Sequence, residues 1–175
     1  MAELHPREEN TSSTVCLFFS HYDAQDDHPD GYSLYGIDVS MSNEQVLEVE
    51  PPRLLLRLPL LNRSEMVCAK LGSKFYFLAG LCLVEKRGCV PVFDTPSDVF
   101  VYDPTNKSMN AKDPAYRVID GESMNCGKVN PTTFEVNGRL YVLGTRFDRT
   151  VEESSLFEEY DPLKSRWTRF NGSSC

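Results

Sequence analysis

The sequence predicts an all-β fold built from repeated antiparallel units of four strands, and three observations carry this prediction. Two segments far apart in the chain have the composition of β-hairpins with strong turn residues. The intervals between matching aromatic and acidic positions recur to the residue. No stretch of about a dozen residues places its apolar side chains at the spacing of an amphipathic helix. Long internal repeats of this kind are typical of propellers and solenoids.

The first element of the repeat is a hairpin that occurs twice. RSEMVCAKLGSKFYFLAG, at 63–80, aligns without a gap on KVNPTTFEVNGRLYVLG, at 128–144. Gly72-Ser73 suits a type II′ turn. In the second copy, Asn137-Gly138 is the strongest short hairpin signal, because a type I′ turn needs positive φ at both central residues. We therefore predict two hairpins, at 66–80 and 131–145.

A second hairpin follows each of the first ones. SDVFVYDPTNKSM, at 97–109, and SSLFEEYDPLKSRW, at 154–167, each contain a strand that ends in Tyr-Asp-Pro. The proline ends ladder pairing and the aspartate can cap the turn. A short strand carrying Met109 or Trp167 is expected to follow.

The spacing joins these modules into one unit and extends the repeat toward the N-terminus. Phe18 and Asp38 lie 20 residues apart, as do Tyr141 and Asp161. An interval of 38 residues separates Asp38 from Tyr76, and the same interval separates Asp103 from Tyr141 in the next unit. TVCLFFS and YSLYGIDVS therefore take the roles of a second and a third strand, and a unit of 58 to 65 residues occurs nearly three times.

These residues resemble kelch repeats, in which Gly-x-hydrophobic-Tyr-Val-x-Gly precedes Tyr-Asp-Pro and a tryptophan. GRLYVLG, EEYDP and RW form the best match, followed by KFYFLAG with FVYDP. Over most of 14–170 the chain is similar to the kelch-repeat β-propeller family, in a divergent, plant-type form. Its departures are Ala79-Gly80 and Gly144-Thr145 in place of Gly-Gly pairs, and a single tryptophan, Trp167. The resemblance implies a propeller with four-stranded antiparallel blades.

The predicted fold class is an incomplete β-propeller of about two and three-quarter four-stranded antiparallel kelch-type blades. A ring of about four to eight blades is needed for closure. The chain is thus either a fragment of a longer propeller, which we favour, or a chain that closes by self-association. We expect a disordered tail at 1–13, a partial blade at 14–49, blades at 66–109 and 131–170, and a tail at 171–175.

Burial can also be predicted from the repeat. FYFLAG and LYVLG are apolar on both faces, as expected for strands stacked between two neighbours. The outer faces of the first and last units, including Leu156, Tyr160 and Trp167, should lack a covering neighbour. We therefore expect the isolated chain to be marginally stable or to associate through its exposed blade edges. PPRLLLRLPLL, at 51–61, is interpreted as a connection that packs beneath the ring.

Composition narrows the function classes. A net charge of −8 and a pI near 4.9 argue against nucleic acid or an anionic membrane as the main partner. No apolar run approaches the roughly 20 residues that span a bilayer. We expect a cytoplasmic or nuclear protein. The six cysteines contain no C-x-x-C pair, so we interpret them as reduced and mostly structural.

The segment HYDAQDDHPDG, at 21–31, is rich in oxygen and imidazole donors. As an EF-hand loop it would need a glutamate at the twelfth position, where Ile37 stands. As a zinc or iron site it offers His21 and His28 without a third ligand from the other units. We therefore expect a loop at 20–31 that binds no metal tightly, and no cofactor.

The leading functional hypothesis is a non-catalytic interaction module that binds a protein partner. The loops after the second and fourth strands of a meander emerge at one end, so 20–31, 50–65, 81–96, 110–130 and 145–154 should line one surface. On them, seven basic side chains could pair with carboxylates or phosphates. These candidate partner-binding residues are Arg53, Arg57, Arg63, Lys86, Arg87, Arg146 and Arg149.

The kelch resemblance implies two alternative roles. One is that of a substrate adaptor of a ubiquitin ligase. The other is that of a fragment of a kelch-type metal-dependent enzyme whose ligands lie in missing blades. All three histidines, His5, His21 and His28, precede the two complete repeats, so the sequence identifies no catalytic residue.

Overall fold

The computed structural model describes residues 11–22, 29–42, 45–59, 63–87, 90–106, 118–145 and 157–170. Within these ranges the regular structure consists of β-strands, which confirms the all-β prediction. The strands are β1 (Thr11–Tyr22), β2 (Pro29–Ser42), β3 (Gln45–Val49), β4 (Arg53–Pro59), β5 (Arg63–Ser64), β6 (Val67–Leu71), β7 (Lys74–Leu78), β8 (Leu81–Arg87), β9 (Val90–Asp94), β10 (Val99–Tyr102), β11 (Val118–Asp120), β12 (Val129–Val136), β13 (Arg139–Thr145), β14 (Phe157–Asp161) and β15 (Arg166–Arg169).

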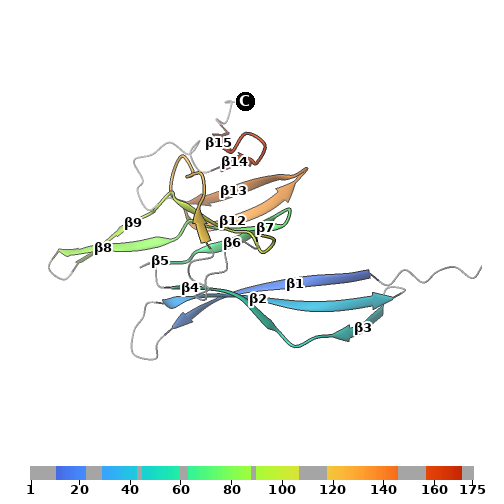
Figure 1. Cartoon of the computed structure of the whole chain (residues 1–175). Helices are drawn as coiled ribbons and strands as arrows, with labels where there is room; N and C mark the ends of the chain where they lie inside the picture. The colour runs from blue at the N-terminus through green and yellow to red at the C-terminus, as the bar shows by residue number, and fades with distance from the viewer. Residues whose placement is uncertain are drawn as a thin grey trace, which may run out of the picture.

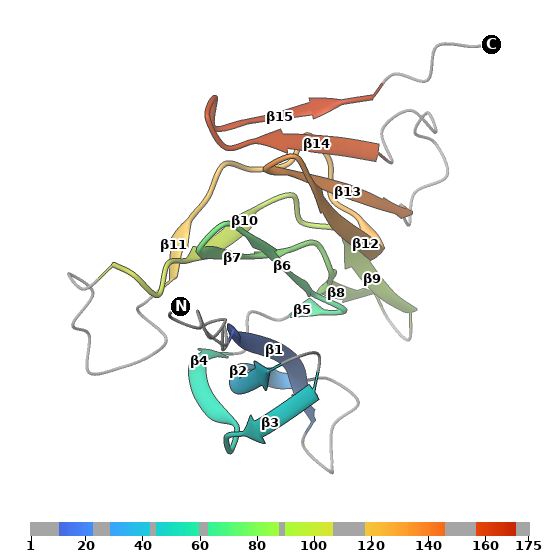
Figure 2. The same cartoon turned by 90° about the vertical axis from the view of Figure 1, so that its right-hand side faces the viewer.

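The strands form three stacked antiparallel sheets and one smaller side sheet (Figure 1). The first sheet has the order β1-β2-β3, with β4 also on β2. The second has the order β11-β10-β7-β6, and the third is a β12-β13-β14-β15 meander. The side sheet contains β5, β8 and β9. Figure 2 shows the second sheet between the other two, an arrangement that fits a β-propeller-like architecture.

The first sheet differs from the prediction at its edge. β3 pairs with the end of β2 and β4 with its beginning, so the two strands lie one after the other along β2. Pro51 and Pro52 separate them, and the backbone N–H of Glu50 continues the ladder to the carbonyl of Asp38 at 2.9 Å. The interpretation of 51–61 as a connection beneath the ring is thus wrong for 53–59. β1 begins at Thr11, inside the predicted tail.

The second sheet confirms the first hairpin and corrects the position of its fourth strand. β6 and β7 turn at Gly72-Ser73, with Leu71 opposite Lys74. β10 pairs with β7 on one side and with β11 on the other. The fourth strand in the described chain is therefore Val118–Asp120. The strand expected at Met109 lies outside the described residues.

The side sheet replaces a predicted loop. The sequence predicts a loop at 81–96, yet β8 and β9 form a hairpin there, and β5 pairs with the start of β8. This hairpin extends away from the stacked sheets in Figure 1. The third sheet, in contrast, follows the prediction, with β12 and β13 turning at Asn137-Gly138 and β14 preceding the Trp167 strand.

Two apolar clusters hold the three sheets together. Phe75, Phe77 and Tyr102 of the second sheet pack on Leu34 and Leu56 of the first. Tyr76, Leu78 and Val99, which point to the opposite face, pack on Leu140, Val142 and Trp167 of the third. Alternate residues of β7 therefore serve different interfaces, as the double-sided apolar run FYFLAG predicts.

The outer face of the third sheet corrects two burial predictions. Leu140 and Val142 are fully buried, whereas Leu143 on the other face is 48% exposed, so LYVLG is buried on one face only. Tyr160 and Trp167 point inward and are buried. The expectation that they lie uncovered is wrong. Leu156 lies outside the described residues.

Candidate functional site

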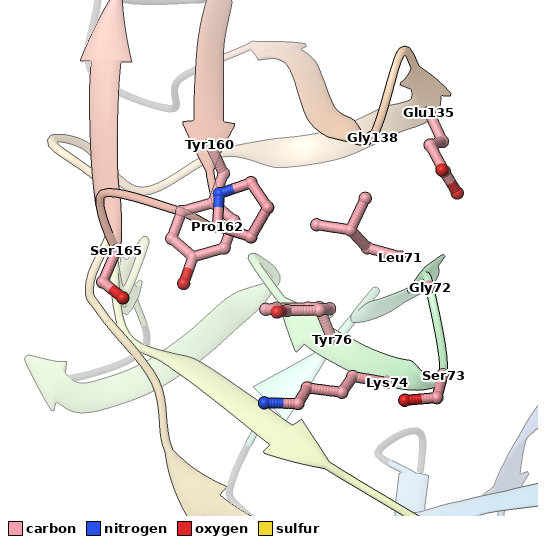
Figure 3. A pocket seen from close by; sticks show the side chains of 10 residues that line it. All are labelled: Leu71, Gly72, Ser73, Lys74, Tyr76, Glu135, Gly138, Tyr160, Pro162 and Ser165. Atoms are coloured by element: carbon pink, nitrogen blue, oxygen red, sulfur yellow. The ribbon is translucent and has the colours of Figure 1, made fainter.

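A hollow of about 380 Å³ opens between the second and third sheets, and we call it the turn hollow. The turns of three hairpins form its rim: β6–β7, β12–β13 and β14–β15. Figure 3 shows its lining residues, which are Leu71, Gly72, Ser73, Lys74, Tyr76, Glu135, Gly138, Tyr160, Pro162 and Ser165. It lies at the end of the strands opposite to the predicted binding loops, so sequence reasoning missed it.

Backbone conformation explains the rim. Gly72 and Gly138 have φ of 59° and 72°, in the left-handed region that glycine occupies without strain. Asn137 and Ser165 also have positive φ, at 51° and 48°. A Cβ at Gly72 or Gly138 would meet nothing within 4 Å, so conformation selects glycine here. The turns therefore present backbone groups and small side chains to the hollow.

The Tyr-Asp-Pro motifs shape the neighbouring turns in the same way in both repeats. Oδ1 of Asp103 accepts hydrogen bonds from the Thr105 backbone N–H at 2.9 Å and hydroxyl at 2.6 Å. These bonds hold the pKa of Asp103 below its usual value. Oδ1 of Asp161 accepts the backbone N–H of Leu163 at 3.0 Å. Both aspartates cap their turns, as the sequence predicts.

Two tyrosines form the floor of the hollow. The rings of Tyr76 and Tyr160 are 5.5 Å apart. The indole N–H of Trp167, whose ring packs on Tyr160, donates to the carbonyl of Glu122 at 2.7 Å. In Figure 3 the two hydroxyls point to the side where Ser165 lies. The floor is thus apolar in its body and polar at its surface.

Burial, followed by the influence of Tyr160, raises the pKa of Tyr76 to about 12. The folded protein therefore keeps this proton at a pH where an unfolded tyrosine, of pKa about 10, has lost it. The stabilising contribution is present below about pH 10 and is lost as the pH rises toward 12. We expect the melting temperature of the wild type to fall more steeply over this range than that of Tyr76→Phe. Parallel curves in calorimetric scans from pH 8 to 12 would contradict this.

The charged side chains near the rim differ in how closely they are paired. Lys74 lies 3.9 Å from Asp103, a long contact, and its side chain is 48% exposed. Arg139 contacts Glu159 and Asp161, and Lys164 contacts Asp161 at 3.4 Å. A long and partly exposed pair such as Lys74–Asp103 contributes about 0–1 kcal/mol. The Lys74 amine at the rim can therefore bind a carboxylate or carbonyl at little cost.

The structure places the predicted basic residues in different surroundings. Arg53 contacts Asp38 at 3.5 Å, and Arg57 is exposed on β4. Arg63 is buried: its guanidinium pairs with Asp98 and lies over the Phe100 ring at 5.1 Å. Arg63 is thus part of the interior. Arg53 and Arg57 are thus exposed on the edge strand β4, whereas Arg63 is buried.

The other candidates lie outside the described part of the chain. The side chains of Lys86 and Arg87 fall outside it, as do Arg146 and Arg149 altogether. Residues 23–28, the centre of the acidic loop, are likewise outside the described residues. Nε2 of His21 lies 2.6 Å from the Ser33 hydroxyl. Within the described ranges, no group of three or more His, Cys, Asp or Glu side chains is placed to hold a metal ion.

A buried ion pair, missed by sequence reasoning, joins the third sheet to the segment that enters it. Nζ of Lys128 lies 2.5 Å from Oε1 of Glu158, and neither side chain is exposed. Asn125 donates its backbone N–H to Oε2 at 2.8 Å, and Cys126 donates its own to Oε1 at 3.1 Å. We call these four residues the Glu158 node. The repeat alignment offered a signal, because Lys128 aligns with Arg63 and both prove to be buried cations with an acidic partner.

The described cysteines are consistent with a structural role. Cys16, Cys68 and Cys82 are free thiols, and the Cys126 thiol donates to Oε1 of Glu158 at 3.2 Å. Burial raises the pKa of Cys68 to about 12 and also raises that of Cys16 and Cys82. Because the thiolate is the reactive form, these three thiols are poorly suited to nucleophilic chemistry.

Known proteins resemble this chain distantly, in structure rather than in sequence. No protein-family model matches the chain, and no curated protein matches it. A solved structure described as "Structure of YjhT" is 14% identical, with a TM-score of 0.47. The match covers 80% of this chain and 48% of that one, so the chain spans about half the length of the matched structure. The described residues form no helix long and apolar enough to cross a membrane.

Proposed function

We propose that the chain is a non-catalytic protein-interaction module built from kelch-type propeller blades, and that the turn hollow holds a segment of a partner protein. The hollow itself carries this proposal: three hairpin turns of the β-scaffold border an open hollow of about 380 Å³. That volume suits one or two side chains of an extended segment rather than a folded domain. The repeated Tyr-Asp-Pro turns support the kelch assignment.

The chemistry of the lining defines the kind of segment. The Lys74 ammonium and the hydroxyls of Ser165 and Tyr160 are donors, and Leu71 and Pro162 provide an apolar wall. Glu135 is the acidic side chain of the lining. An extended segment with an acidic residue beside Lys74 and a small apolar residue on the wall satisfies these groups. A role as substrate adaptor of a ubiquitin ligase, in the cytoplasm or the nucleus, is the family role that such a module would take.

The test uses a displayed library of short peptides selected against the purified chain, followed by calorimetric titration of the enriched sequences. We expect enriched peptides to contain an acidic residue and Lys74→Ala to weaken them about tenfold or more, as loss of a charge-assisted hydrogen bond predicts. Lys70→Ala is the matched control, because Lys70 is exposed on the neighbouring strand outside the hollow. No enrichment, or equal affinity for all three proteins, would refute the site.

A further inference from the structure

The outer face of the third sheet presents a row of stacked aromatic rings to solvent. We call it the third-sheet outer face, and its apolar members are Phe134, Tyr141, Leu143, Phe157 and Phe170. Phe157 stacks on Phe170 at 4.8 Å and on Tyr141 at 5.9 Å, and Phe134 stacks on Tyr141 at 5.3 Å. Phe134, Leu143 and Phe170 are 41–48% exposed. A contiguous apolar patch of this kind marks an interaction surface.

The internal repeat identifies what such a face contacts. Aligning 63–79 on 128–144 makes Phe134, Tyr141 and Leu143 equivalent to positions of the second sheet that are buried. Their equivalents are Ala69, Tyr76 and Leu78. Phe157 pairs with Leu143 as Val99 pairs with Leu78, so Val99 is the equivalent of Phe157. All four belong to the cluster against which the third sheet packs. The third-sheet outer face thus has the pattern of a face that receives the next sheet.

The first sheet carries the complementary pattern on its own outer face. We call this the first-sheet outer face, and its apolar members are Val15, Leu17, Phe19 and Tyr35. Val15 and Phe19 are 48% and 50% exposed, and Phe19 contacts the Tyr35 ring at 6.2 Å. The 58-residue interval makes Leu17 and Phe19 equivalent to Phe75 and Phe77.

Phe75 and Phe77 form the side of the second sheet that receives the preceding sheet. Leu140 and Val142 do the same in the third sheet. The two open faces are therefore the two halves of the interface that the chain already makes twice. The third-sheet outer face corresponds to the side of a sheet that packs on the following sheet. The first-sheet outer face corresponds to the side that packs on the preceding sheet. A second copy of the chain therefore offers the matching surface to each.

We propose that two copies of this chain form a closed ring of six stacked sheets, in which the third-sheet outer face of each copy packs on the first-sheet outer face of the other. Such a contact joins two different surfaces, and contacts of this type either close into rings or grow into fibres. Each copy contributes three stacked sheets. Two copies supply six, within the range of about four to eight that closes a propeller, whereas three copies would exceed it. The proposal is independent of the turn hollow.

The test is the mass of the 175-residue chain by light scattering after size-exclusion chromatography. We expect twice the chain mass of 19.9 kDa. Leu143→Glu and Phe19→Glu should each give monomers, because in a ring of identical copies either change places a carboxylate in both interfaces. Leu163→Glu, at a 96% exposed turn position on neither face, is the matched control and should remain dimeric.

Mixing the two single variants gives a readout that a simple loss of folding cannot imitate. In a mixed pair one interface contains both substitutions and the other contains none, so the mixture should recover dimers that neither variant forms alone. Circular dichroism of each variant confirms that the sheets are intact. A monomeric wild type, a dimeric Phe19→Glu, a mass that grows without limit, or no recovery on mixing would each overturn the ring.

Discussion

Glu158→Ala is expected to lower the free energy of unfolding by about 3–5 kcal/mol, the usual result of removing one partner of a buried ion pair. The change removes the carboxylate that pairs with the fully buried Lys128 ammonium. It also removes the acceptor for the backbone N–H groups of Asn125 and Cys126. For a chain of this size the melting temperature should fall by about 10 °C.

The pH dependence separates the charge from the packing of this side chain. Burial raises the pKa of Glu158, but the hydrogen bonds from Lys128 and Asn125 outweigh it, so the pKa lies below its usual value. Its contribution is therefore fully present above about pH 4.3, the pKa of an unfolded glutamate, and is lost as the pH falls through the folded pKa. The stability gap between wild type and Glu158→Gln should be wide at pH 7 and should narrow in acid.

The controls for the node come from the same segment. Glu122→Ala removes an exposed carboxylate close to the node in sequence and should change the stability by less than about 0.5 kcal/mol. The double change Lys128→Met with Glu158→Leu should recover part of the loss, because no charge is then desolvated although the backbone N–H groups of Asn125 and Cys126 still lose their acceptor. If Glu158→Ala were as stable as the wild type in urea unfolding, the Glu158 node would not stabilise the packing of residues 125–128 on the third sheet.

Phe77→Ala is expected to destabilise the chain by about 3–5 kcal/mol, as truncation of a fully buried aromatic side chain does. Phe77 lies at the centre of the cluster between the first and second sheets, with its ring 5.3 Å from that of Phe18. Because this cluster joins the two sheets, the loss should be local as well as global.

Hydrogen exchange provides the local measurement. Amide protons of β2, which carries Tyr32 and Leu34 into the same cluster, should exchange faster in Phe77→Ala than those of β13. Leu163→Ala, at a 96% exposed position, should leave both stability and exchange unchanged. If amide exchange became equally faster in all three sheets, the sheets would unfold as one unit. The cluster between the first and second sheets would then not be a separable interface.

Turn chemistry made the hairpins predictable. Gly72-Ser73 and Asn137-Gly138 form the expected turns, with positive φ at Gly72, Asn137 and Gly138, because turn geometry depends on a few neighbouring residues. The alternation of apolar residues, in contrast, did not predict which face of each strand is buried. The strands FEEYD and RWTR have no continuous apolar face, so the sequence assigns Tyr160 and Trp167 to the outer face although they point inward.

The pairing of strands that are distant in the chain could not be predicted from the sequence. The apolar run of 51–61 is as suitable for a packed connection as for a strand, and the free edge of β2 made part of it β4. The short strand β11 likewise depends on pairing with β10, and the β8–β9 hairpin pairs with β5. Local composition does not predict either pairing. Similarly, the rim turns of the hollow are predictable one by one, but not their meeting across two sheets.

The all-β class, the repeat, the two turns and the capping aspartates can be predicted from the sequence alone, because each depends on interactions within a few residues or on a spacing that can be counted. The folded structure was needed to show which face of each strand is covered, where the hollow opens and that Lys128 pairs with Glu158. These features depend on sheets stacking side by side, and stacking brings together residues whose distance in sequence carries no information about their distance in space.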